Sequence, residues 1–136
     1  MTESFVLVTG GSRNIGAGIC KRLSEDGLKV ISTDIVAPNH EHFFDSYLVN
    51  FSNTLEAQEI LFEITEKYSI TRLVNNVGVV IPSAIEETSI TDFNHIFQTN
   101  ALSALISTKA VLPQMKLKRF GRIVSISSRV VLGKEL

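Results

Sequence analysis

Apolar and polar residues alternate in blocks along the chain, and the blocks predict strands that take turns with helices. The run at 4–10 is apolar without a break and ends in glycine, which is typical of a parallel strand buried on both faces. Runs at 28–33, 46–51, 70–78 and 121–127 predict further strands, of which 46–51 is the weakest. The sequence therefore predicts about five strands.

Helical periodicity fills the intervals between these runs. Apolar residues recur every fourth position over 15–23, directly after the first strand. The period is helical again from residue 52, with Ser52 or Asn53 available as the N-cap. The "SITD" segment predicts the start of a long helix that runs towards Pro113. Its expected apolar face consists of Phe93, Ile96, Phe97, Ala101, Ala104 and Leu105.

This order of elements predicts the fold class. Strands that alternate with helices pair in parallel through right-handed crossovers, so we expect an α/β fold with a doubly wound parallel sheet and helices on both faces. We found no internal repeat or linker, and residues 1–136 are expected to form one domain. In such folds a ligand binds at the carboxyl ends of the strands.

Composition narrows the classes of partner. The 136 residues are 44% hydrophobic and 20% charged, with a net charge of -1 and no long basic run, so neither nucleic acid nor a membrane surface is expected as a partner. The basic cluster at 116–122 is interpreted as a solvated helix end. Cys20 is the only cysteine, which excludes an internal disulfide and favours the reducing cytoplasm. No apolar run approaches the roughly 18 residues of a membrane span.

The stretch "TGGSRNIG" at 9–16 lies between the first strand and the first helix. In this context backbone N–H groups and the positive helix end can point at a phosphate. Gly10, Gly11 and Gly16 would let that group come close because they carry no side chain. A P-loop is excluded, since no Gly-Lys-Ser or Gly-Lys-Thr follows. A tight turn without a ligand remains the alternative.

The wider pattern resembles a known family. The glycine turn, "LVNNVG" at 73–78, Asn100 in the long helix and "GRIVSISS" at 121–128 together resemble the short-chain dehydrogenase/reductase family, most of all the 3-oxoacyl-carrier-protein reductase type. The resemblance runs across essentially the whole chain. It implies a Rossmann-type domain that binds NAD or NADP and transfers hydride between nicotinamide and a carbonyl or alcohol.

The resemblance assigns roles in the glycine turn. Gly10, Ser12 and Gly16 match the family's phosphate-binding positions, and Ile15 is placed to contact the cofactor. Asn14 stands where the family usually has its middle glycine. Asn tolerates a left-handed backbone better than other non-glycine residues, so the turn is expected to survive this change.

Further cofactor residues follow from the second motif. Asn75, Asn76 and Gly78 fall on the stretch that stabilises the central strands of the family and lines the adenosine side. Asn50 stands where the family commonly has an Asp near the adenine. Its amide can both donate and accept a hydrogen bond, which makes it a weaker candidate.

Two side chains bear on the choice of cofactor. Asp34 ends the second predicted strand, where it can accept hydrogen bonds from the adenosine ribose and would repel a 2′-phosphate. Arg13 argues the other way, because a cation in the glycine turn can pair with that phosphate. Relatives that use NADP often have a basic residue at the position of Ile35. We therefore expect a preference for NAD, with NADP possible, and Arg13 solvated or paired to Asp34.

The resemblance also implies a catalytic pair. Ser128, the second Ser of "ISS", matches the Ser that hydrogen-bonds the substrate oxygen. Asn100 matches the Asn that holds a water for proton relay. Without the resemblance, Ser128 would be interpreted as a strand-end hydroxyl and Asn100 as a polar helix residue whose hydrogen bonds are satisfied.

The family's proton donor is not found in this sequence. It is a Tyr with a Lys four residues later, whereas Tyr47 and Tyr68 are followed at that distance by Phe51 and Arg72. We therefore expect the fold to be truncated before its last strands, so that the chain binds cofactor without turnover. The alternative is a non-catalytic dinucleotide-binding, regulatory or interaction module.

The remaining expectations concern association and metals. An uncovered fifth strand and long helix predict a homo-oligomer. His40 and His42 form a pair without further ligands at suitable spacing, so no metal site is expected. Cys20 is expected in the core, and His95 in solvent.

Overall fold

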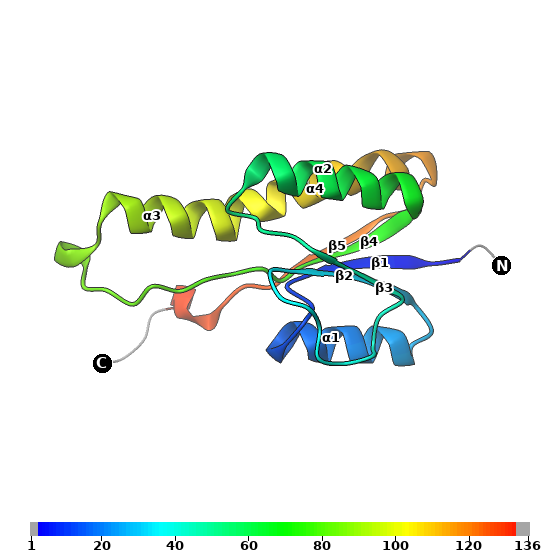
Figure 1. Cartoon of the computed structure of the whole chain (residues 1–136), viewed down its shortest axis with the longest axis horizontal. Coiled ribbons are helices and arrows are strands. Elements are labelled where there is room, and N and C mark those ends of the chain that lie inside the picture. Colours follow the sequence, from blue (N-terminus) through cyan, green and yellow to red (C-terminus); the bar gives the residue numbers. More distant parts are fainter. Residues whose placement is uncertain (1–2, 133–136) are drawn as a thin grey trace.

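The computed structural model describes residues 3–132 and consists of one parallel sheet with helices packed on it (Figure 1). The strands are β1 (Phe5–Thr9), β2 (Lys29–Asp34), β3 (Asp45–Leu48), β4 (Ile70–Asn75) and β5 (Arg122–Ser125). The helices are α1 (Asn14–Glu25), α2 (Thr54–Lys67), α3 (Ile90–Phe97) and α4 (Ser103–Leu117), with the π-helical segment η2 (Gln98–Leu102) between α3 and α4. Two short 3-10 turns complete the order, η1 (Ile85–Glu87) and η3 (Arg129–Leu132).

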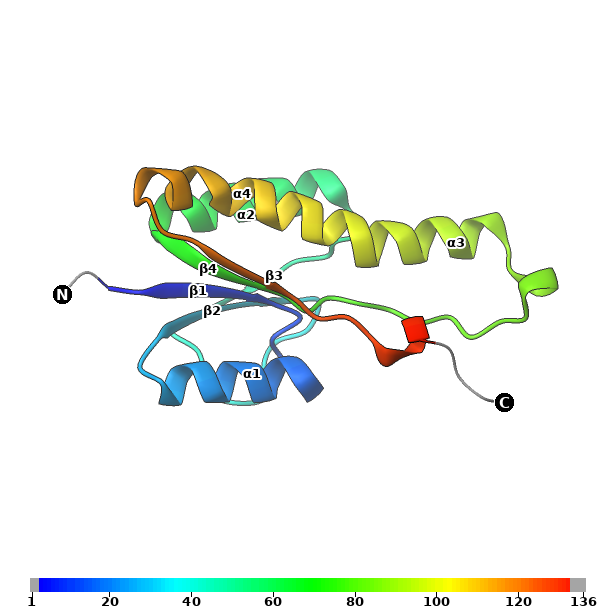
Figure 2. The same ribbon diagram turned by 180° about the vertical axis from the view of Figure 1, so that it is seen from behind.

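The sheet has the order β3-β2-β1-β4-β5, and every pair of neighbouring strands is parallel. Helix α1 covers one face, while α2 and α4 lie on the other (Figures 1 and 2). The predicted doubly wound fold is therefore confirmed. Its consequence for function is that the glycine turn after β1 lies in the middle of the carboxyl edge of the sheet.

Successive side chains of β1 serve two separate core layers. Leu7 packs with residues of α2 and α4, whereas Val6 and Val8 pack towards α1 and Cys20. All five residues of β1 are buried, as expected for a strand with a helix on each face. Cys20 is a core residue, as predicted, and burial raises the pKa of its thiol to about 11.

The third strand, like the fourth, ends three residues before its predicted bound, since β4 was expected at 70–78 and ends at Asn75. The third strand was expected at 46–51, but β3 starts at Asp45 and ends at Leu48. The chain turns there because Asn50 Oδ1 accepts a hydrogen bond from the backbone N–H of Ser52 at 3.0 Å. One more backbone hydrogen bond to β2 follows the strand, from the N–H of Val49 to the carbonyl of Asp34 at 2.8 Å, and the turn then leads directly into α2.

Helix α2 begins after one of its two predicted N-cap residues. Asn53 is the cap, since its side chain accepts a hydrogen bond from the N–H of Glu56. The buried face consists of Ala57, Leu61, Ile64 and Thr65. Leu55, which precedes that face by half a turn, is 74% exposed.

The predicted long helix is interrupted. It starts at the Ser89 cap as expected, where the hydroxyl accepts from the N–H of Asp92, but it passes through the π-helical turn of η2 before α4. Its expected apolar face is largely open, with Phe93 58%, Phe97 59% and Leu105 55% exposed. For Phe93 and Phe97 the reason is visible in Figure 1, where α3 extends beyond the end of the sheet, so that no strand lies beneath it.

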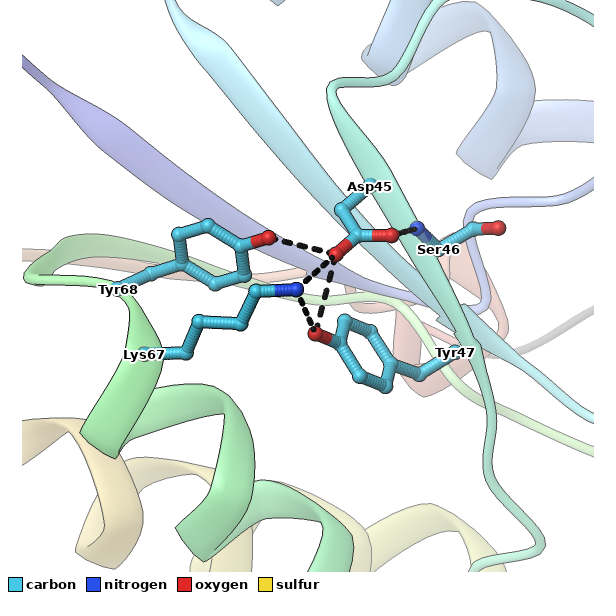
Figure 3. Close-up of polar contacts among 5 residues, drawn as sticks. All are labelled: Asp45, Ser46, Tyr47, Lys67 and Tyr68. Atoms are coloured by element: carbon cyan, nitrogen blue, oxygen red, sulfur yellow. Dashed lines mark hydrogen bonds and ion pairs between the residues drawn. The ribbon is translucent and has the colours of Figure 1, made fainter.

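A polar cluster joins β3 to the end of α2 (Figure 3). Asp45 Oδ2 accepts hydrogen bonds from the Tyr68 hydroxyl at 2.6 Å, the Tyr47 hydroxyl at 3.0 Å and Lys67 Nζ at 3.1 Å. Burial alone would raise the pKa of Asp45, but these donors and the Ser46 N–H together lower it to about 2. Both tyrosines of the chain thus serve a structural cluster.

Candidate functional site

A cleft of about 390 Å³ opens at the carboxyl ends of the central strands. Its walls come from the segments that follow β1, β2, β3 and β4, and from the end of the α3–η2 helix. The lining residues are Gly10, Arg13, Asn14, Ile15, Gly16, Asp34, Ile35, Val49, Asn50, Phe51, Ser52, Asn76, Val77, Gly78, Val79, His95 and Thr99. The cleft therefore collects most of the predicted cofactor residues, whereas Gly11, Ser12 and Asn75 are not among its lining residues.

Ser12 points away from the cleft. Its side chain is buried and its hydroxyl donates a hydrogen bond to the carbonyl of Val36 at 2.8 Å. Its N–H donates to Asp34 Oδ2 at 3.0 Å. Ser12 thus connects the glycine turn to the segment after β2, and its predicted contact with a phosphate stays a prediction.

The backbone of the glycine turn is left-handed at two positions. Gly10 has φ 68° and Asn14 has φ 51°. The expectation that Asn14 keeps the turn in place of a glycine is confirmed in this respect. Gly16 allows the tightest approach, because a Cβ there would lie 1.8 Å from the carbonyl oxygen of Gly10. The turn and the first turn of α1 are packed backbone to backbone.

Asn76 supports the glycine turn from the neighbouring strand. Its Nδ2 donates to the carbonyl of Gly10 at 3.0 Å, and its backbone N–H donates to Thr9 Oγ1 at 3.1 Å. Asn75, one residue earlier, donates to the hydroxyl of Ser125 at 3.4 Å. The two amides therefore join the ends of β1, β4 and β5 to one another.

Asp34 brings the negative charge of the cleft. The residue ends β2, is 8% exposed, and uses one carboxylate oxygen for the N–H of Ser12 and the other for the N–H of Ile35. Each oxygen keeps a second lone pair for a ligand. Arg13 is exposed, and within residues 3–132 no ion pair joins it to Asp34, so it takes the solvated alternative.

The π-helical segment η2 holds two walls of the cleft. Gln98 Nε2 donates to the carbonyl of Ser52 at 2.6 Å, which fixes the loop after β3. Asn100 pairs its amide with the backbone of Val79, donating at 2.8 Å and accepting at 2.7 Å, which fixes the loop after β4. Thr99 lies between them and lines the cleft.

Sequence reasoning missed the roles of Gln98 and Thr99, and it placed His95 in solvent alone. His95 is exposed, as expected, but it also lines the cleft. A signal for the first two was available, because the polar triplet "QTN" interrupts an otherwise apolar helix face. The apolar pattern of the helix does not predict which groups such polar residues contact.

The predicted catalytic residues lie outside the lining of the cleft. Ser128 follows β5, is exposed, and accepts a hydrogen bond from the N–H of Val130 at 3.2 Å. Asn100 lies behind the wall at Gly78, where an added Cβ would be 3.7 Å from its Oδ1. In the part of the chain that the structure describes, no hydrogen bond joins Ser128 to Asn100.

Comparison with known proteins identifies the family of the chain. The model of the short chain dehydrogenase family matches residues 4–134. The chain belongs to the short-chain dehydrogenase family. A 3-oxoacyl-acyl-carrier-protein reductase from Vibrio cholerae is 34% identical over 133 residues, which is 91% of this chain and 54% of the relative. The chain thus spans about half the length of this curated member of the short-chain dehydrogenase family.

Solved structures of short-chain dehydrogenases share the fold. One from Leptospira borgpetersenii with bound NAD+ has a TM-score of 0.86 at 21% identity, covering 98% of this chain and 55% of that one. A 3-oxoacyl-acyl-carrier-protein reductase from Agrobacterium tumefaciens with NADP bound has a TM-score of 0.83 at 24% identity, covering 93% and 53%. These likenesses support the Rossmann-type architecture.

Residues 3–132 contain neither a metal-binding cluster nor a helix suited to span a membrane. No three His, Cys, Asp or Glu side chains gather there as a metal site would require. None of the helices in the same range is both long enough and apolar enough to cross a membrane.

Proposed function

We propose that the chain is the dinucleotide-binding part of an oxidoreductase that transfers hydride between a nicotinamide cofactor and a carbonyl or alcohol. The observation that carries the proposal is the cleft itself. It brings a closely packed glycine turn, the start of α1 and the carboxylate of Asp34 to one place. Its volume of about 390 Å³ lies within the usual range for small-molecule sites.

The glycine turn fits a pyrophosphate. Gly10 and Gly16 present backbone without side chains, and the positive end of the α1 dipole favours an anion there. Ile15 is 66% exposed and lines the same wall, as a residue that covers a cofactor would. Asn50 lines the wall after β3, where we place the adenine.

We further propose that NAD is preferred over NADP. The carboxylate of Asp34 lines the cleft with free lone pairs, which suits the two hydroxyls of a ribose and opposes a 2′-phosphate. Ile35 offers no positive charge beside it. Arg13 also lines the cleft, and its positive charge could pair with the 2′-phosphate of NADP, which is why NADP remains the alternative cofactor.

The bound dinucleotide would supply the hydride. In the complete reaction we assign Ser128 to hold the substrate oxygen and Asn100 to hold the relay water. Because the sequence contains no Tyr-x-x-x-Lys pair, we expect this chain alone to bind cofactor without turnover. The second candidate function, a non-catalytic dinucleotide-binding module, rests on the same missing pair.

Cofactor titrations test this proposal. NADH and NADPH are titrated into the protein, and the fluorescence of the nicotinamide is followed. We expect NADH to bind more tightly, and Asp34→Asn to lose that preference, because it removes the charge and keeps the size of the side chain. Tighter binding of NADPH by both proteins would refute the NAD assignment, and no binding of either cofactor would refute the proposed function.

A further inference from the structure

One peptide group of the glycine turn is held at both ends. The N–H of Ser12 donates to Asp34 Oδ2 at 3.0 Å, and the carbonyl of Gly11, on the same peptide plane, accepts from His40 Nε2 at 2.9 Å. The thiol of Cys20 is a weaker second donor to the same carbonyl, at 3.6 Å. Since a peptide group is planar, contacts at its N–H and at its carbonyl fix its orientation about the chain. Asp34 is the last residue of β2, and His40 lies in the segment that follows it.

The geometry also determines which nitrogen of His40 carries the proton. The backbone N–H of His42 donates to His40 Nδ1 at 3.1 Å, so Nδ1 must be an acceptor. In the neutral ring the hydrogen is then on Nε2, which points at the carbonyl of Gly11. The ring is packed against the rings of His42 and Phe43, with centroids 5.7 Å and 5.8 Å away.

These contacts lie behind the cleft. Gly11 and Ser12 are buried and line no part of it, whereas Gly10 and Arg13, on either side of them, do. Space behind the turn is tight, because a Cβ on Gly11 would come within 2.4 Å of Ser32 Oγ. The hydrogen bond from His40 to the Gly11 carbonyl therefore restrains the backbone between Gly10 and Arg13, the two neighbours that line the cleft.

We propose that His40 is a positioning residue for the dinucleotide, holding the peptide between Gly11 and Ser12 so that the glycine turn is preformed for the pyrophosphate. The proposal rests on the proposed function. The loop over 35–44 would then support the glycine turn from behind, although His40 does not line the cleft. A turn fixed in advance binds more tightly because less conformational freedom is lost on binding.

The test compares ligands with and without phosphates. ADP-ribose and adenosine are the probes, and their affinities are measured by ligand-observed NMR. His40→Phe keeps the ring packing but removes the donor, and we expect it to weaken ADP-ribose about five-fold while adenosine is unchanged. His40→Gln restores an N–H donor of similar reach, and ADP-ribose affinity should return to within about two-fold of the wild type.

His42→Phe is the matched control. The His42 side chain makes no hydrogen bond to the turn within the described part of the chain, so this variant should bind ADP-ribose as the wild type does. Amide spectra without ligand give a second readout, in which Ser12 should shift in His40→Phe and not in His42→Phe. Unchanged ADP-ribose affinity and an unchanged Ser12 resonance in His40→Phe would overturn the proposal. If the wild type bound no ADP-ribose, the proposed function would fall first.

Discussion

Strands β1 and β5 both have apolar residues at their centres but very different surroundings. Every residue of β1 is buried, whereas every residue of β5 is exposed. β1 pairs with a strand on each edge and has a helix layer on each face, while β5 pairs with β4 alone. Apolar residues thus predict where a strand forms, but the neighbouring strands and helices determine which of its side chains are buried.

The candidate site follows the same division. The glycine turn continues directly from the buried strand β1, and its supports reach it from β2 and β4. Ser128 follows the exposed strand β5. The glycine turn is therefore held by hydrogen bonds with Asp34 and Asn76, while the predicted catalytic Ser follows a strand whose residues are all exposed.

The largest contrast is expected for a leucine and an isoleucine in equivalent strand positions. Leu7 in β1 is fully buried, and Leu7→Ala should lower the free energy of unfolding by about 4 kcal/mol through lost contacts and a cavity. Ile123 in β5 is 42% exposed, and Ile123→Ala should cost about 1 kcal/mol. Urea denaturation at neutral pH measures both. Equal losses would mean that β5 is covered in solution.

Gly16→Ala tests the backbone packing at the end of β1. The added Cβ would meet the carbonyl oxygen of Gly10 at 1.8 Å, so we expect a loss of about 3 kcal/mol in unfolding free energy together with loss of dinucleotide binding. Gly18→Ala is the control on the same helix, since its Cβ would meet nothing within 4 Å. That variant should be more stable by about 0.5–1 kcal/mol and should bind normally.

The edge strand β3 is held in place by a contact whose strength depends on pH. β3 is fastened to α2 through Asp45, whose folded pKa of about 2 lies below its usual value of 3.8. Between about pH 4 and pH 2 Asp45 is protonated in the unfolded chain but still ionised in the folded chain. The free energy of unfolding therefore falls as the pH falls. Asp45→Asn should lose about 1 kcal/mol at pH 7 and lack this part of the acid slope. A variant that keeps the full slope would assign it to other carboxylates.

The smallest effect on stability is expected for Val124→Lys, because Val124 is 53% exposed on β5. The unfolding free energy should change by less than about 0.5 kcal/mol. If copies of the chain associate through β5, as the predicted homo-oligomer requires, the mass in sedimentation should fall. Leu55→Lys is the control, a more exposed apolar residue on α2. A wild type that sediments as a monomer at all concentrations would contradict the predicted association.

The order of elements and the sheet topology could be predicted because they depend on apolar runs and short connections. The position of the glycine turn was predictable from the same local pattern, whereas the left-handed backbone of Asn14 was predictable from the family resemblance and from the tolerance of Asn for that conformation. The π-helical turn at η2 was not, because it accompanies a pairing between Asn100 and Val79 across 21 residues of chain. No property of the helix sequence by itself specifies that partner.

Side-chain direction was the other part that sequence could not supply. Ser12 was expected to face a phosphate, but the Val36 carbonyl and the Asp34 carboxylate draw it to the back of the turn. The open apolar face at Phe93 and Phe97 has a similar origin, since periodicity shows which residues share a side and not what lies against it.

The cleft is assembled from segments that are far apart in the chain, at residues 10–16, 34–35, 49–52, 76–79 and 95–99. None of these segments can form it alone, so any molecule that binds there binds only the folded state. Ligand binding and folding are then thermodynamically linked, and a ligand at a hundred times its Kd adds about 2.7 kcal/mol to the unfolding free energy. The melting temperature of the whole chain therefore reports occupancy of the cleft, and a thermal shift measurement can rank candidate ligands without any assay of chemistry.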